Sequence, residues 1–134
     1  MPTPEPGTAE DWLRYARADL AISRMTPDGD VMIELLCFHA QQSAEKSIKA
    51  VLVSAGVAFE RTHSLNALLA TLPAQVIVPA VISQAVYLND YAVGFRYPSE
   101  REPTDLEELE DAIATAQAVY TWAENQVRGM LSLE

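Results

Sequence analysis

The chain has 134 residues, 49% of them apolar, which is enough for one compact domain and too little for two. Its net charge of -10, from 9 basic and 19 acidic residues, removes the usual electrostatic footprint of a nucleic-acid-binding protein, and we expect no DNA partner. A single cysteine, the lack of a signal-peptide pattern and the lack of a long uncharged apolar run predict a soluble cytoplasmic protein without a membrane span.

The charge is unevenly distributed along the chain. Residues 1–67 contain 6 basic and 9 acidic side chains, whereas residues 68–134 contain 3 and 10. Because phosphates and other anions are attracted by local positive charge, we expect any anion site in the first half.

The N-terminal residues 1–7 contain three prolines and a glycine, which predicts a flexible arm ahead of one domain over residues 8–131. Thr8 and Asp11 have the spacing of a capping box, and apolar residues then recur at helical spacing. The first helix is predicted over residues 9–24.

A turn sequence, Thr-Pro-Asp-Gly-Asp at 26–30, precedes the second helix, which is predicted over residues 31–55 with Asp30 as its N-cap. Gly56 stands where a left-handed residue would end this helix, and Glu45 and Lys49 form an i,i+4 pair. The apolar positions of the helix are Ile33, Leu36, Cys37, Ala40, Ala44, Ile48, Val51, Leu52 and Ala55.

The middle of the chain predicts two shorter helices. The first spans about residues 65–72 and ends before Pro73, and the second runs from a first turn at Pro79 to about Ala92, before Gly94. Val76, Ile77 and Val78 could form a strand, but we expect none, because the chain shows no partner strand.

The start of the last helix is the clearest helix-start signal in the sequence. Thr104 and Glu107 form a second candidate capping box, with acidic residues in the first turn. Apolar residues at steps of three and four predict one continuous apolar face on this helix, which we call its seam: Leu106, Leu109, Ile113, Ala116, Tyr120, Ala123 and Val127. About five helices with short connections predict an all-α, up-and-down antiparallel bundle, in which the second and last helices are the longest elements.

The sequence offers little for catalysis or metal binding. His39 and His63 are its only histidines, and neither has metal-ligand spacing to Cys37. Cys37 lies on the apolar stripe of the second helix, which indicates a buried hydrophobe rather than a nucleophile. We therefore predict no metal, no cofactor and no assigned catalytic residue.

Four polar residues, His39, Gln42, Lys46 and Lys49, follow one face of the second helix at steps of three, four and three. One interpretation is a solvated face, with the histidine and the glutamine bonded to neighbouring helices. The other is a face that binds a phosphate, a nucleotide or a partner, because two lysines and a histidine in register supply positive charge and donors at one place.

The run Cys-Phe-His-Ala-Gln-Gln-Ser-Ala-Glu-Lys-Ser-Ile-Lys-Ala-Val-Leu at 37–52 resembles the central signature of the HEPN family, the higher eukaryotes and prokaryotes nucleotide-binding domains. Three further segments agree with this family in order: Trp12 with Ala18-Asp19-Leu20, Thr62-His63-Ser64-Leu65, and Tyr91 with Arg96-Tyr97-Pro98. The resemblance covers residues 9–127.

This resemblance implies a helical bundle that is often a homodimer, and in prokaryotes a partner nucleotidyltransferase in a toxin–antitoxin pair. Many family members resemble ribonucleases in which an arginine is followed four to six residues later by a histidine. Here no histidine follows Arg96 or Arg101, and Arg61 precedes His63 by only two residues. The family motif for RNA cleavage is therefore absent.

Three functions remain in competition. The first is a non-catalytic binding module that acts through a nucleotide or a nucleotidyltransferase-type protein. The second is a ribonuclease toxin with a non-standard site, in which Arg96 holds phosphate and His39 or His63 transfers protons. The third is a purely structural interaction protein. The distance from either histidine to Arg96 would separate the first two.

For the binding function we predict one polar cleft that accepts an anion, formed by Arg96, Lys46, Lys49, His39, Gln42 and Tyr97. Pro98 restrains the loop that carries Arg96, which suits bidentate contact with phosphate. In the alternative interpretation, Arg96 pairs with Asp90 or Glu100 and only fastens the loop.

Tyr91, Phe95 and Tyr97 cluster in the sequence at the end of the fourth predicted helix. A bundle core alone would not bury all three, and aromatic residues are favoured at interface centres. Together with the resemblance, this predicts a homodimer.

Overall fold

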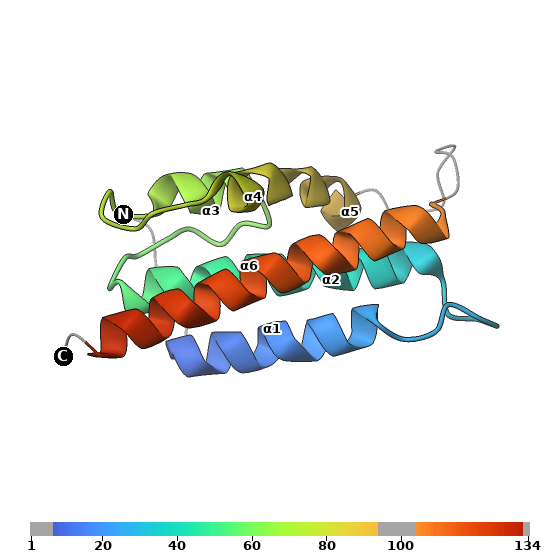
Figure 1. Cartoon of the computed structure of the whole chain (residues 1–134), viewed down its shortest axis with the longest axis horizontal. Coiled ribbons are helices and arrows are strands. Elements are labelled where there is room, and N and C mark those ends of the chain that lie inside the picture. The colour runs from blue at the N-terminus through green and yellow to red at the C-terminus, as the bar shows by residue number, and fades with distance from the viewer. Residues whose placement is uncertain (1–6, 94–103, 133–134) are drawn as a thin grey trace.

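The computed structural model describes residues 7–93 and 104–132, and this part of the chain is helical with no β-strand (Figure 1). Val76 to Val78 form no strand, as the sequence predicts. None of the described helices is long and apolar enough to span a membrane. The elements are α1 (Ala9–Ser23), α2 (Ile33–Ser54), α3 (Leu65–Thr71), α4 (Ala80–Ser83), the 3-10 helix η1 (Gln84–Leu88), α5 (Asn89–Val93) and α6 (Leu106–Ser132).

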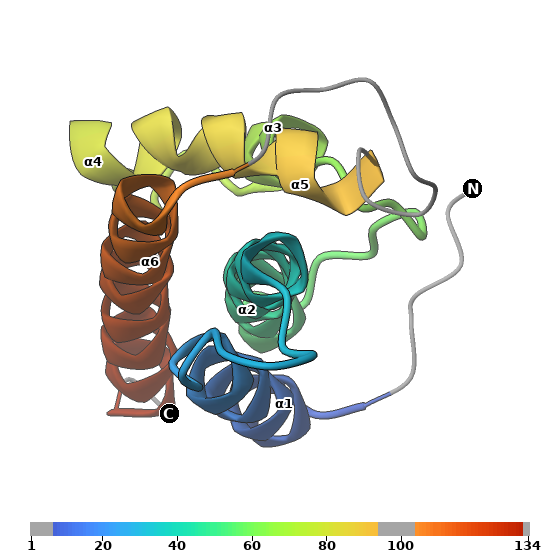
Figure 2. The same ribbon diagram turned by 90° about the vertical axis from the view of Figure 1, so that its right-hand side faces the viewer.

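The long helices run in two directions. In Figure 1, α1 runs from left to right, whereas α2, α3 and α6 run from right to left, and Figure 2 shows the segment from α4 to α5 crossing α2. Figure 2 shows α2 in the middle, with α1, α6 and the α3–α5 segment around it, and α2 packs against each of these elements. The predicted all-α, up-and-down bundle is confirmed, with α2 and α6 as its longest helices.

The predicted ends of the first two helices are largely correct. The Thr8 hydroxyl accepts from the Asp11 N–H at 3.1 Å, and the Asp11 carboxylate accepts from the Thr8 N–H at 3.1 Å, which completes a capping box. At the end of α2, Gly56 has φ +72, and the Val57 N–H donates to the Leu52 carbonyl at 3.0 Å. This 6→1 bond and the left-handed glycine are the features of a Schellman cap.

The start of α2 differs from the prediction. Asp30 is not the N-cap, because the Val31 N–H closes a turn onto the Asp28 carbonyl at 2.9 Å, with Gly29 at φ +55. Met32 then has extended backbone and serves as the N-cap without a side-chain bond. The helix therefore begins at Ile33 rather than at residue 31.

The predicted helix from Pro79 to Ala92 is broken into α4, η1 and α5. Pro79 is the N-cap of α4, with ψ 155, rather than a residue of its first turn. The sequence of this segment is rich in β-branched and aromatic residues and contains Ser, Asn and Asp, which are weak helix formers. At its centre, Asn89 accepts from the Leu65 N–H at 2.8 Å, so this segment satisfies a free donor at the start of α3.

The capping box of α6 lies one residue later than predicted. Asp105 accepts from the Glu108 N–H at 2.8 Å, and Glu108 accepts from the Asp105 N–H at 3.2 Å. The predicted pair of Thr104 and Glu107 does not form, because the Thr104 N–H points to the Glu34 carboxylate at 3.4 Å. In this register Leu106 is exposed rather than part of the seam.

The core is formed mainly by aliphatic and small side chains of α1, α2, α3, α4, η1 and α6, and Cys37 is fully buried within it, as predicted. Tyr91 is also buried, and its hydroxyl donates to Glu108 at 3.2 Å. Burial is the main reason that the pKa of Tyr91 lies far above its usual value. Tyr91 is therefore covered within one chain and offers no surface to a dimer partner. Phe95, Tyr97 and Gly94 lie outside the described residues.

The position of the α6 cap is testable by mutation. We expect Asp105→Ala to lower the free energy of unfolding by about 1 kcal/mol, because it removes the acceptor of the Glu108 N–H. Glu107→Ala is the matched control and should change it by less than about 0.5 kcal/mol. Urea denaturation followed by circular dichroism measures both. A larger loss in Glu107→Ala than in Asp105→Ala would contradict the observed register.

Candidate functional site

The central helix α2 carries polar side chains at positions that other helices cover. The hydroxyl of Ser43 donates to the Ala16 carbonyl at 2.8 Å, and that of Ser47 donates to the Ser43 carbonyl at 2.8 Å. Such bonds are required because an unpaired polar group in the interior costs about 1–3 kcal/mol. The buried polar residues of this helix are Gln41, Ser43, Glu45, Ser47 and Lys49.

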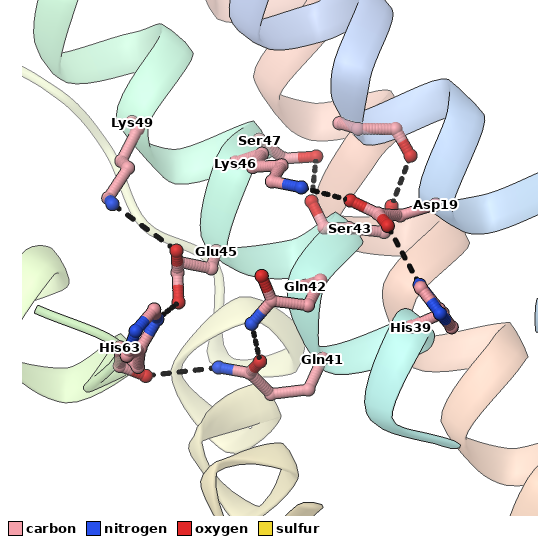
Figure 3. Close-up of polar contacts among 11 residues, drawn as sticks. Asp19, His39, Gln41, Gln42, Ser43, Glu45, Lys46, Ser47, Lys49 and His63 are labelled. Carbon is pink, nitrogen blue, oxygen red and sulfur yellow. Dashed lines mark hydrogen bonds and ion pairs between the residues drawn. The ribbon is translucent and has the colours of Figure 1, made fainter. Parts of the chain in front are cut away.

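One cluster joins α1 to α2 at the surface. The carboxylate of Asp19 accepts from the Lys46 Nζ at 2.6 Å through one oxygen and lies 2.9 Å from the His39 Nδ1 through the other (Figure 3). Asp19 is buried, whereas the side chains of His39 and Lys46 are 31% and 22% exposed. We call these three residues the Asp19 cluster.

A second cluster has a buried acid and a buried lysine, whereas the side chain of its histidine, His63, is 56% exposed. Glu45 pairs with the Lys49 Nζ at 3.2 Å and with the His63 Nδ1 at 2.7 Å (Figure 3). The side chains of Glu45 and Lys49 are 3% and 4% exposed, and the Lys49 ammonium also lies 5.2 Å from the Trp12 ring centre. The predicted i,i+4 pair of Glu45 and Lys49 is thus confirmed, but as a buried pair. We call Glu45, Lys49 and His63 the Glu45 cluster.

Two glutamines fasten the connection that carries His63. The amide of Gln41 donates to the His63 carbonyl at 3.0 Å, and the amide of Gln42 donates to the Gln41 Oε1 at 2.7 Å. His63 is therefore held through both its backbone and its ring, so its position is fixed relative to α2.

The structure divides the predicted polar face into two. His39 and Lys46 come together on Asp19, whereas Lys49 lies on Glu45 inside the bundle and Gln42 bonds to Gln41. Arg96 and Tyr97 lie outside the described residues. Anion binding by these six residues stays a prediction.

Sequence reasoning missed Asp19 as a site residue, and it identified Glu45 only as the i,i+4 partner of Lys49. Asp19 follows Ala16 by three residues and precedes Leu20, so it falls on the apolar stripe of α1, and its burial could have been inferred from that position. An acidic residue in such a stripe requires partners, because a buried carboxylate is not tolerated alone. Glu45 carried the same signal on α2, beside the buried Ala44 and Ile48.

Both histidines present the same chemistry. A carboxylate lies against Nδ1 of each ring, which orients the imidazole and leaves Nε2 as the second proton-exchanging atom. Among residues 7–93 and 104–132, no three His, Cys, Asp or Glu side chains are grouped so as to hold a metal ion. The Asp19 cluster is therefore suited to anion contact and proton exchange.

Comparison with known proteins bears on the family and the fold of the chain. The HEPN domain family model matches residues 9–126. The chain is similar to the TT1696 protein of Thermus thermophilus, with a TM-score of 0.78 and 32% sequence identity over 88% of this chain and 97% of that one. It is also similar to ST0689, an archaeal HEPN homologue, with a TM-score of 0.71 and 29% identity over 91% and 99% of the two chains. A comparison with curated protein sequences gives no match.

The Glu45 cluster makes a prediction about stability. We expect Glu45→Gln to lower the free energy of unfolding by about 3–5 kcal/mol, because it removes a buried carboxylate that pairs with both Lys49 and His63. The double variant Glu45→Gln/Lys49→Met should recover part of this loss, since the buried ammonium is then removed together with the carboxylate. Glu60→Gln, at an exposed position, is the control. Urea denaturation measures all three, and a near-neutral Glu45→Gln would contradict the assigned pairing.

Proposed function

The chain belongs to the HEPN domain family, and on that premise we propose that it is a nucleotide-binding helical module whose phosphate site is the surface of the Asp19 cluster. The observation that carries this proposal is the convergence of His39 and Lys46 on one carboxylate, with both side chains partly exposed. Such a module binds without cleaving.

The chemistry of the cluster suits a phosphate. Lys46 has three N–H donors, and its bond to Asp19 engages one of them. His39 keeps Nε2 for a further bond, and its protonated form adds a positive charge beside Lys46. Asp19 fixes both side chains in place, so little side-chain entropy is lost when an anion binds. We assign Lys49 no direct contact, because Glu45 already neutralises it in the interior.

We also propose which macromolecules the module binds. The net charge of -10 favours a protein over RNA as the macromolecular partner, and the family resemblance favours a nucleotidyltransferase in a toxin–antitoxin pair. The same resemblance supports a homodimer. Arg96, Gln42 and Tyr97 remain proposed contributors to the anion site.

Nucleotide titration tests the binding function. We expect AMP to bind the purified protein in isothermal titration calorimetry, and Lys46→Gln and His39→Ala to weaken binding about 10- to 100-fold, as for the loss of a hydrogen bond to a charged group. Arg128→Ala, an exposed cation near the end of α6, is the matched control and should bind normally. Equal affinity in Lys46→Gln and the original protein, or no binding at all, would contradict the proposed site.

A ribonuclease is the second candidate function, and one observation favours it. The carboxylate on Nδ1 of His39 or His63 is the arrangement that orients an imidazole for proton transfer at Nε2. In this function Arg96 holds the phosphate. Cleavage of single-stranded RNA by the purified protein that disappears in His39→Ala or His63→Ala would support it, and the absence of cleavage would leave the binding module as the function.

A further inference from the structure

Tyr15 on α1 is exposed beside the Asp19 cluster. It is 53% exposed, although it is a large aromatic residue on a helix that packs against two others. The Lys46 ammonium lies 5.9 Å from its ring centre, and the Arg14 guanidinium carbon lies 5.3 Å from it. Tyr15 is thus an accessible aromatic ring flanked by two cations.

A pocket lies next to this ring. It has a volume of about 260 Å³ and is lined by Gly7, Asp11, Trp12, Arg14 and Tyr15. This is close to the lower end of the range of roughly 300–1,000 Å³ for small-molecule sites. The pocket contains two aromatic side chains and the ion pair of Arg14 and Asp11, so its aromatic rings offer a stacking surface to a planar group.

Trp12, one of the residues that line the pocket, has a buried hydrogen-bond donor. Its indole Nε1 donates to no acceptor among the described residues. A buried donor without a partner is uncommon in a folded protein, and a ligand that reached this nitrogen would provide an acceptor. The ring nitrogens and carbonyl oxygens of nucleobases are acceptors of this kind.

We infer that Tyr15 is the base-stacking residue of the nucleotide site, so that the base lies on the Tyr15 ring at the Trp12 pocket while the phosphate contacts Lys46 and His39. This inference rests on the proposed function and adds the subsite that recognises the base. Lys46 connects the two subsites, because its ammonium contacts Asp19 and also faces the Tyr15 ring.

The energetics favour this arrangement. Stacking of a base on an aromatic side chain is tolerant of base identity, since every base has a π face. The exposed Arg14 side chain contacts the Tyr15 ring and makes a 3.6 Å surface pair with Asp11, so it can exchange the ring for the phosphate at little cost. Binding then adds a charge-assisted contact to the stacking contact.

A second pocket provides the comparison. It has a volume of about 220 Å³ and is lined by Tyr87, Asp90, Tyr91, Glu108 and Asp111. Its three carboxylates repel phosphate, so the exposed Tyr87 there should not assist a nucleotide. Tyr87 is therefore a matched aromatic control for Tyr15.

The test compares AMP with ribose 5-phosphate, which has the same phosphate and no base. We expect AMP to bind the original protein about 5- to 150-fold more tightly in calorimetry, the usual value of one stacked base. Tyr15→Ala should remove this preference and leave ribose 5-phosphate binding unchanged, whereas Tyr15→Trp and Tyr87→Ala should retain it. Circular dichroism verifies that each variant is folded.

The outcomes separate this inference from the proposed function. If Lys46→Gln loses both ligands but Tyr15→Ala keeps the preference for AMP, the phosphate site stands and the stacking inference is overturned. If the original protein binds neither ligand, the proposed function is overturned and the inference with it. A short oligoadenylate identifies the source of the nucleotide: tighter binding than AMP, lost in Tyr15→Ala, supports a single-stranded RNA, and equal or weaker binding supports a free nucleotide.

Discussion

The structure depends on the partners that α2 requires for its buried polar side chains. This helix lies between α1, α6 and the α3–α5 segment, yet it carries a carboxylate and an ammonium at nearly inaccessible positions. Their mutual attraction offsets the cost of removing two charges from water only if the remaining donors and acceptors are also satisfied. His63 meets this requirement for Glu45, and the Gln41 amide holds the same residue by its backbone. The path of the connection between α2 and α3 is therefore set by the pairing of one buried acid.

Asp19 is a second buried carboxylate that requires partners, and its pairing with residues of α2 has a different consequence. Its two partners approach from the surface side and keep part of their side chains in solvent, whereas Glu45 and Lys49 are enclosed. A closed pair stabilises the fold but offers no atom to a ligand. The open cluster holds two donors in fixed positions and leaves them accessible, which is what recognition of an anion requires. The exposure of the lysine side chain, 22% for Lys46 and 4% for Lys49, rather than residue type, separates the candidate anion site from the Glu45 cluster.

The sequence predicted most of the fold and only part of the site. Helical periodicity and local caps such as Thr8–Asp11 and Gly56 depend on neighbouring residues, so they could be predicted from the sequence. The cap of α6 could not, because Thr104-Asp105-Leu106-Glu107-Glu108 contains two overlapping capping patterns and the choice depends on the distant Glu34. The polar face of α2 was predicted as one surface because its actual arrangement also depends on residues that are distant in the chain. Its division follows from Asp19 and His63, which approach it from other parts of the chain.

The strong negative charge of the protein is compatible with a nucleotide site of this kind. At physiological ionic strength charges are screened over about 8 Å, so a small ligand experiences mainly the groups beside it. Near the Asp19 cluster the cationic groups are Lys46, His39 and Arg14, and the carboxylates of Asp19 and Asp11 lie beside them. In the proposed site the aromatic ring of Tyr15 adds affinity that does not depend on charge. A long polyanion extends beyond this range and meets the acidic surface, including the first turn of α6. If the proposed site binds a nucleotide, this charge distribution favours a single nucleotide or a strand end over an extended nucleic acid, and the proposed base contact then supplies most of the specificity.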